Sequence, residues 1–231
     1  MADPLARLPS MVIGGAAIAL ALAATIDTFR QVQVDQMVEA AADQATALAR
    51  GNKAEVRAVA RALPSLQDPR AQVAGALILA RAATVATNET ERQTQLGDAG
   101  RLLASANARR PDWAEGQVSA SFVSSLLAGE AAKRLAARQL ADSYRAAPFL
   151  RDSGLWRVRE GLSSWSQLPA WSQSRLVDEG VWLARLNDPL RADVFDMVRG
   201  SPAYPAFAQR WLELRQGDAD LRGARADRTA P

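Results

Sequence analysis

Three carboxylates are the side chains of this sequence best suited to acid–base chemistry. Glu160 lies in one apolar helical pattern, and Asp178 and Glu179 are adjacent in another. A carboxyl group kept protonated by apolar surroundings can cleave glycosidic bonds together with a second carboxylate. However, Arg157 and Arg159 flank Glu160, and an arginine also precedes the acidic pair, so ordinary surface ion pairs are the simpler explanation. We therefore expect no catalytic residue among them.

Other catalytic groups are missing or isolated. The 231 residues include no histidine and no cysteine, which removes imidazole bases, thiolate nucleophiles, disulfides and the usual ligands of zinc, haem and iron–sulfur clusters. A serine nucleophile would need a lysine base, yet neither Lys53 nor Lys133 stands in a Ser-x-x-Lys spacing, and no glycine-rich phosphate loop occurs. We expect no enzyme activity, no cofactor and no metal site.

The charge pattern does not indicate a nucleic-acid partner. The net charge is only +3, and charges of both signs alternate without a run of five or six of one sign. Only two of the 28 basic residues are lysines, and this composition suggests a high-GC bacterium. A solvated surface of mixed charge is the better interpretation.

The N-terminal segment has the composition of a membrane helix. Met11–Ile26 contains no charged residue, and with its neighbours it approaches the ~20 residues that a bilayer requires. Arg7 precedes this segment and Asp27 follows it, which favours export of the following chain. We predict that 1–29 form a cytoplasmic stub and transmembrane anchor in a bacterial inner membrane, with the bulk periplasmic. The alternatives are a signal peptide cleaved near Ala21–Ala23, which also exports the remainder, and a buried soluble helix.

Helical periodicity continues through the rest of the chain, and prolines, glycines and asparagines interrupt it. We expect an all-α fold with helices over about 34–48, 53–63, 69–85, 96–106, 113–128, 131–146, 153–165, 169–186, 189–199 and 202–216. The polar residues 217–231 are expected to form a disordered tail.

Two of the expected hairpins resemble tetratricopeptide repeats. Both carry the family's small, bulky apolar, small and proline positions at one identical spacing: Ala99, Leu103, Ala106 and Pro111, then Ala136, Leu140, Ser143 and Pro148. The two prolines are 37 residues apart (148 − 111), whereas the family period is about 34, and the aromatic positions of the first helix are not aromatic. The resemblance covers about 71–165. It implies an α-solenoid of antiparallel hairpins over 30–150, continued by a tryptophan-rich part over 151–216, and a generic helical array is the alternative.

Stacked hairpins of this kind bind a peptide or a partner helix on their concave face. The side chains that could anchor a partner are arginines of the hairpins and two tryptophans next to prolines: Arg101, Arg109, Arg110, Trp113, Arg134, Arg138, Arg145 and Trp171. A solvated surface position is the simpler interpretation of each of these arginines. Trp156, Trp165 and Trp182 are in phase with apolar neighbours, so we expect them in the core.

In residues 143–165 the sequence Tyr-Arg-Ala-Ala-Pro-Phe is followed by an aromatic helix, and this segment resembles repeat proteins that accompany bacterial polysaccharide polymerases and exporters. This resemblance implies a scaffold that binds another envelope protein during exopolysaccharide or surface-glycan assembly. One alternative is a protein that binds glycan or peptidoglycan, or less readily cleaves it, with exposed indoles around an isolated buried glutamate. The other is a small accessory subunit of a membrane complex, which requires an exposed apolar stripe on 34–48.

Overall fold

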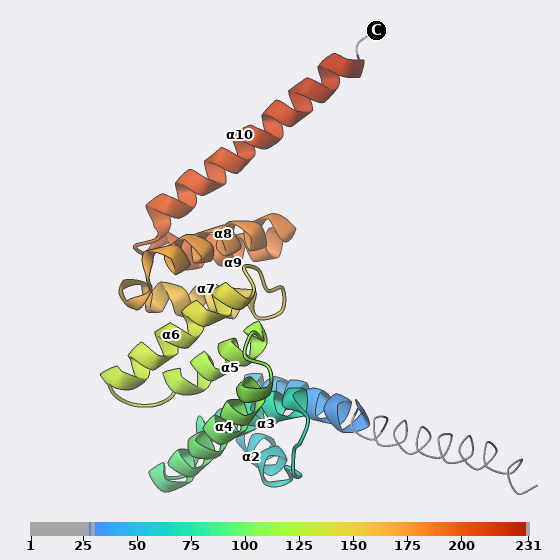
Figure 1. The fold of residues 1–231 in the computed structure, drawn as a ribbon, viewed down its shortest axis with the longest axis vertical. Helices are drawn as coiled ribbons and strands as arrows, with labels where there is room; N and C mark the ends of the chain where they lie inside the picture. The colour runs from blue at the N-terminus through green and yellow to red at the C-terminus, as the bar shows by residue number, and fades with distance from the viewer. Residues whose placement is uncertain (1–27, 29–30, 230–231) are drawn as a thin grey trace, which may run out of the picture. The chain divides into compact units, whose positions relative to one another are not determined.

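The computed structural model describes residue 28 and residues 31–229 (Figure 1). Within these residues every regular element is helical and no strand occurs, so the expected all-α class is confirmed. The predicted membrane anchor at 1–29 lies, apart from Thr28, outside the described residues. None of the described helices combines the length and the apolar character that a bilayer crossing requires.

The helices follow one another through short connections. A helix over 31–49 precedes α2 (Lys53–Arg61), α3 (Pro69–Ala83), α4 (Glu89–Arg109), α5 (Ala114–Ser125), α6 (Glu130–Ala146), α7 (Gly154–Ser163), the short 3₁₀ helix η2 (Trp165–Gln167), α8 (Ala170–Leu186), α9 (Asp188–Arg199) and α10 (Tyr204–Thr229).

Several predicted breaks are helix caps. The side-chain oxygen of Asp68 accepts a hydrogen bond from the backbone N–H of Arg70 (2.8 Å), immediately before Pro69 starts α3. Asn88 accepts in the same way from the backbone N–H of Glu91 (2.8 Å), so α4 begins at Glu89 and includes Glu89 and Thr90, which were predicted to form a break. The predicted disordered tail at 217–231 is wrong as far as residue 229, because α10 continues beyond Gln216 to Thr229.

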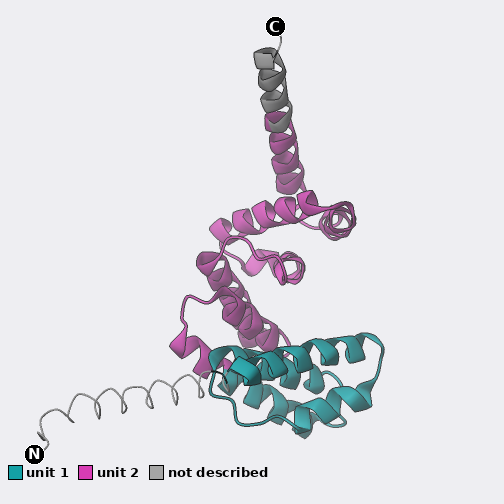
Figure 2. Cartoon of the chain, turned by 90° about the vertical axis from the view of Figure 1, so that its right-hand side faces the viewer, with its two compact units in different colours: residues 1–102 teal, residues 103–231 magenta. Residues whose placement is uncertain are grey.

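Chain contacts divide the protein into two compact units, residues 1–102 and residues 103–231 (Figure 2). The repeat-like hairpins over 30–150 and their tryptophan-rich continuation over 151–216 stay a prediction. In unit 1 the apolar stripe of the 31–49 helix packs against α2 and α3, with Val34, Ala41 and Ala47 buried. The amide of Gln44 is also buried there, and it donates to the carbonyls of Val56 (2.9 Å) and Ile78 (3.0 Å). This amide joins three helices.

Unit 2 contains the larger apolar core, built by α6 to α10. Gly161 of α7 allows the close approach of the buried Leu176 of α8, because a Cβ at this glycine would lie 2.0 Å from a Leu176 methyl group. The aromatic side chains expected in the core pack against it while remaining partly exposed: Trp156, Trp165 and Trp182, together with Trp211.

The small and bulky positions that carry the repeat resemblance are all buried: Ala99, Leu103, Ala106, Ala136, Leu140 and Ser143.

Candidate docking groove along α8

One face of α8 carries large aromatic and charged side chains at helical spacing. Trp171, Arg175, Asp178, Trp182 and Arg185 follow one another at intervals of 4, 3, 4 and 3 residues, which places them on one side of the helix. The remaining face of α8 supplies buried leucines and valines to the core of unit 2. The fold therefore fixes one face of α8 inward and leaves this stripe at the surface.

A first hollow of about 440 Å³ lies where α6 meets the start of α8, and we call it the α6–α8 hollow. Its lining consists of Tyr144, Arg145, Pro148, Trp171 and Arg175. The guanidinium of Arg145 lies 5.1 Å from the centre of the Trp171 indole, a cation–π geometry, although the Trp171 side chain is still 41% exposed. Two residues proposed from the sequence as partner anchors are thus brought together.

A second hollow of about 540 Å³ lies between α8 and α10, and we call it the α8–α10 hollow. Its lining consists of Phe149, Arg175, Asp178, Trp182, Arg185, Leu186, Arg210 and Leu214. Phe149 is 43% exposed, and its ring lies 5.4 Å from that of Trp182. Arg175 lines both hollows, so they are neighbours along α8. We refer to them together as the α8 groove.

The α8 groove is positively charged at its centre. Its lining contains four arginines and one aspartate. Arg145 forms an ion pair with Asp142 (2.5 Å), and Arg210 forms one with Asp178 (2.9 Å). Arg175 has no acidic partner within the described part of the chain. An exposed guanidinium therefore stands between two hollows that are walled by aromatic rings.

A buried ion pair lies beneath this groove. Arg157 of α7 and Glu179 of α8 are both fully buried and interact through two contacts, one from Nε to Oε2 at 2.7 Å and one from Nη2 to Oε1. The surface ion pairs expected from the sequence are wrong for Glu179, because its partner is 22 residues away and neither side chain reaches solvent. Sequence neighbours could not reveal this pair.

The ion pair also holds the connection between α6 and α7. Arg157 donates to the carbonyls of Ala147 (3.0 Å) and Pro148 (3.1 Å), and the backbone N–H of Leu150 donates to Glu179 (2.8 Å). These bonds satisfy backbone groups that have no helical partner and fix the segment that carries Phe149. The aromatic wall of the groove is thus positioned from below.

The buried carboxyl of Glu179 is held by contacts within the protein. Burial raises the pKa of the Glu179 carboxyl, while the hydrogen bonds and charge of Arg157 act in the opposite direction. Burial likewise raises the pKa of Tyr144, whose ring lies 4.1 Å from the Arg157 guanidinium. Glu179 lines neither hollow of the groove. Its carboxylate is used in folding contacts.

The other two acidic candidates from the sequence are Glu160 and Asp178. Glu160 is half-buried, and burial raises the pKa of its carboxyl, which a side-chain hydrogen bond with Ser164 partly opposes. Glu160 lines none of the hollows along α8. Asp178 is bound to Arg210. Within the described residues, no three acidic side chains gather as metal ligands would.

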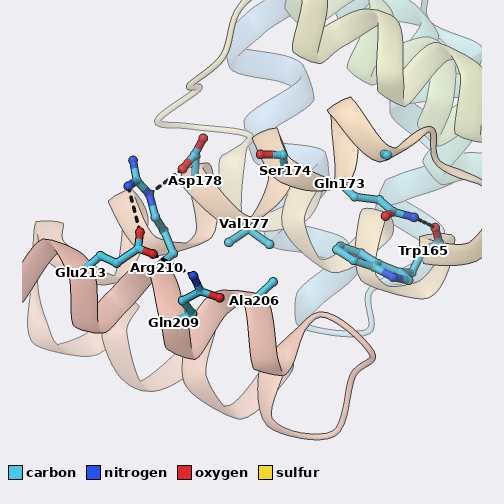
Figure 3. A pocket seen from close by; sticks show the side chains of 10 residues that line it. Trp165, Gln173, Ser174, Val177, Asp178, Ala206, Gln209, Arg210 and Glu213 are labelled. Atoms are coloured by element: carbon cyan, nitrogen blue, oxygen red, sulfur yellow. Dashed lines mark hydrogen bonds and ion pairs between the residues drawn. The ribbon is translucent and has the colours of Figure 1, made fainter.

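A third hollow, of about 540 Å³, lies on the other side of the Asp178–Arg210 pair, between α8, η2 and α10 (Figure 3). Most of its polar groups are engaged within the protein. Gln173 donates to the carbonyl of Trp165 (2.8 Å), Gln209 donates to Glu213 (2.9 Å), and Arg210 lies between Asp178 and Glu213. The polar side chains of Gln173, Gln209 and Arg210 are therefore already engaged in this hollow.

The remaining anchor residues proposed from the sequence lie away from the groove lining. Arg101, in unit 1, forms an ion pair with Asp98. In unit 2, the Arg110 guanidinium lies 4.7 Å from the Trp113 ring, and Arg109 is exposed. Arg134 and Arg138 are exposed on α6, 11 and 7 residues before Arg145 and therefore on the same side of that helix.

Most of the groove was not predicted from the sequence: Phe149, Arg175, Trp182, Arg185 and Arg210. The signal that could have revealed part of it is the alternating aromatic and charged stripe of 171–185. Comparisons with protein-family models, with curated proteins and with solved structures give no match to this chain.

Proposed function

We propose that this chain is a non-enzymatic scaffold, anchored in the bacterial inner membrane by its N-terminal segment, which binds another envelope protein in the α8 groove. The observation that carries this proposal is the exposed Arg175 between two aromatic-walled hollows. Arginine and tryptophan are enriched among the residues that dominate binding energy at protein interfaces. The groove offers both, on a helix held rigidly by the core of unit 2.

The membrane and envelope parts of the proposal are supported by the sequence. The uncharged run at 11–26 and the charges that flank it favour an anchor with the remainder exported. The resemblance of the hairpins to tetratricopeptide repeats favours binding as the mode of action, and the resemblance of 143–165 favours a role in exopolysaccharide or surface-glycan assembly. The partner is then another protein of that assembly.

Glycan binding is supported less well by the same surface. Cleavage of a glycosidic bond would need an isolated buried glutamate in an open cleft. Glu179 is instead paired with Arg157 and lines neither hollow of the groove. Most indoles of unit 2 pack against its core. Of the two groove indoles, Trp171 is 41% exposed and Trp182 is half-buried, so a sugar ring could stack only on Trp171. Glycan binding is therefore an outcome that the experiments must distinguish.

The alternative hypothesis, an accessory subunit of a membrane complex, requires an exposed apolar stripe on 34–48. Val34, Ala41 and Ala47 are instead buried in unit 1, and Met37 and Leu48 pack against its cores. Among the described residues of this helix, the exposed large apolar side chains are Val32 and Val38. This arrangement favours the scaffold over the accessory subunit.

Site-specific photo-cross-linking in cells tests the proposed function. A photoreactive phenylalanine analogue replaces Leu186, which lines the groove and is 41% exposed, so Trp171 and Arg175 remain intact. The same analogue at Asp193, an exposed residue of α9 that lines no hollow along α8, is the control. We expect a defined cross-linked envelope protein from position 186 only, and its loss when Arg175→Glu is added. Identical products from both positions, or none from either, would overturn the proposal.

A further inference from the structure

We infer that the occupant of the α8 groove is an amphipathic helix of the partner protein, with an acidic side chain that Arg175 binds between two sets of apolar contacts. This inference rests on the proposed function and names the chemistry of its partner. It follows from the charge distribution of the groove, from the spacing of its two hollows and from the helical walls that enclose them.

The charge distribution selects an acidic side chain. Arg145 and Arg210 already have carboxylate partners, Asp142 and Asp178. Arg175 has none among the described residues, and its guanidinium is exposed where the two hollows adjoin. A guanidinium can bind a carboxylate through two parallel hydrogen bonds, which fixes orientation as well as charge. A carboxylate of the partner therefore gains more binding free energy at Arg175 than at Arg145 or Arg210.

The hollows select apolar side chains on both sides of that carboxylate. Trp171, Tyr144 and Pro148 wall the α6–α8 hollow, while Phe149 and Trp182 wall part of the α8–α10 hollow. Trp171 and Trp182 are 11 residues apart on α8, which corresponds to about 16 Å along the helix axis. A partner helix lying along α8 covers this distance in three turns. Apolar residues at i, i+4, i+7 and i+11 would then face both hollows.

The walls of the groove favour a helix over an extended segment. All the residues that line it belong to helices or to the α6–α7 connection, and the described chain has no strand edge that could pair with an extended peptide. An extended segment would bring unpaired backbone N–H and C=O groups against the aromatic walls, which is unfavourable. A helix satisfies its own backbone and presents only side chains.

Synthetic peptides provide the test. Three 18-residue helical peptides share leucines at i, i+4, i+7 and i+11 and differ only at the positions flanking this stripe, which are all glutamate, all glutamine or all lysine. Each carries a fluorescent label, and binding to the full-length chain is measured by fluorescence polarisation in mild detergent at low salt. We expect the glutamate peptide to bind about tenfold more tightly than the glutamine peptide, and the lysine peptide more weakly still.

Charge reversal makes the test specific. Arg175→Glu should invert the preference, so that the lysine peptide binds better than the glutamate peptide. Arg199→Glu changes the net charge by the same amount at an exposed position of α9, and it should leave the preference unchanged. Circular dichroism of each variant verifies that the helices remain folded. Equal binding of all three peptides, or a preference that Arg175→Glu does not alter, would overturn the inference.

The remaining outcomes separate this inference from the proposed function. If all the peptides fail while the cross-link from position 186 persists and depends on Arg175, the chain docks a protein but the helical occupant is wrong. If acidic oligogalacturonate binds in an Arg175-dependent manner and the peptides do not, the occupant is a glycan and the inference is also wrong. Failure of both the cross-link and the peptides removes the proposed function itself.

Discussion

Replacing either partner of the buried Arg157–Glu179 pair should destabilise unit 2 severely. Both side chains are fully buried, and each is the charge partner of the other. Arg157→Met would leave the Glu179 carboxylate without its counter-charge, and Glu179→Met would do the same to the guanidinium. The variants to compare are these two single substitutions and the double substitution.

The expected magnitudes follow from the contacts. Removing one partner of a buried ion pair costs about 3–5 kcal/mol, because the remaining charge stays desolvated. Arg157→Met also removes the donors to the carbonyls of Ser143, Ala147 and Pro148, each worth about 1 kcal/mol. The double variant buries no charge at this site, so its cost should fall below the sum of the single costs by about 2–3 kcal/mol.

Tryptophan fluorescence is the appropriate assay for this cycle. All six tryptophans lie in unit 2, between residues 113 and 211, so their emission follows the unfolding of that unit alone. Urea titrations of the full-length chain give the free energy of unfolding for the parent and the three variants. If the parent proves marginally stable, the single variants will unfold without urea. The double variant then still reports whether two charges are better removed together than one.

Two results would refute the reasoning. Single substitutions that each cost less than about 1 kcal/mol would mean that the pair is not desolvated in solution. Single costs that add to the cost of the double variant within about 0.5 kcal/mol would mean that the two side chains do not interact. Either result would remove the buried cluster as the support of the groove.

Three further predictions concern individual side chains. Gln44→Ala should cost about 1–2 kcal/mol, because it removes two hydrogen bonds to buried helix carbonyls, and hydrogen exchange in α2 and α3 should accelerate. Gly161→Ala should destabilise unit 2 by about 1–3 kcal/mol in urea titrations, because the added methyl group would collide with the buried Leu176. Gly97→Ala should instead stabilise α4 by about 0.5–1 kcal/mol, because no atom lies within 4 Å of the added methyl group. Thermal unfolding followed by circular dichroism measures this second change. Burial raises the pKa of Glu160, so the folded state binds the carboxyl proton more tightly than the unfolded state does. The protonated carboxyl therefore adds to the free energy of unfolding below the usual glutamate pKa, and this contribution is lost as the pH rises through the raised pKa. Glu160→Gln should therefore raise the Tm at about pH 7 but not at about pH 4, and an equal effect at both values would contradict the shift.

Local signals in the sequence predicted the helices well. Asp68-Pro69, Gly129 and Pro148 mark real boundaries because capping and backbone geometry act within a few residues. Glu179 was misjudged for the opposite reason. Its partner comes from another helix, and only packing decides that both side chains are buried. The groove was missed in the same way, since α6, α8, α10 and the α6–α7 connection each supply part of its lining.

The link between the buried pair and the groove leads to a last prediction. A buried ion pair is often replaceable by apolar residues of similar size without loss of stability, so stability alone does not explain its presence. Here the pair also binds the backbone at Ala147, Pro148 and Leu150, which flank Phe149 at the groove wall. We therefore expect the Arg157→Met, Glu179→Met double variant to fold and yet to bind the glutamate peptide at least about tenfold more weakly, since Phe149 is no longer held. Polarisation measurements on the folded double variant decide this, and unchanged affinity would show that the pair serves the core alone.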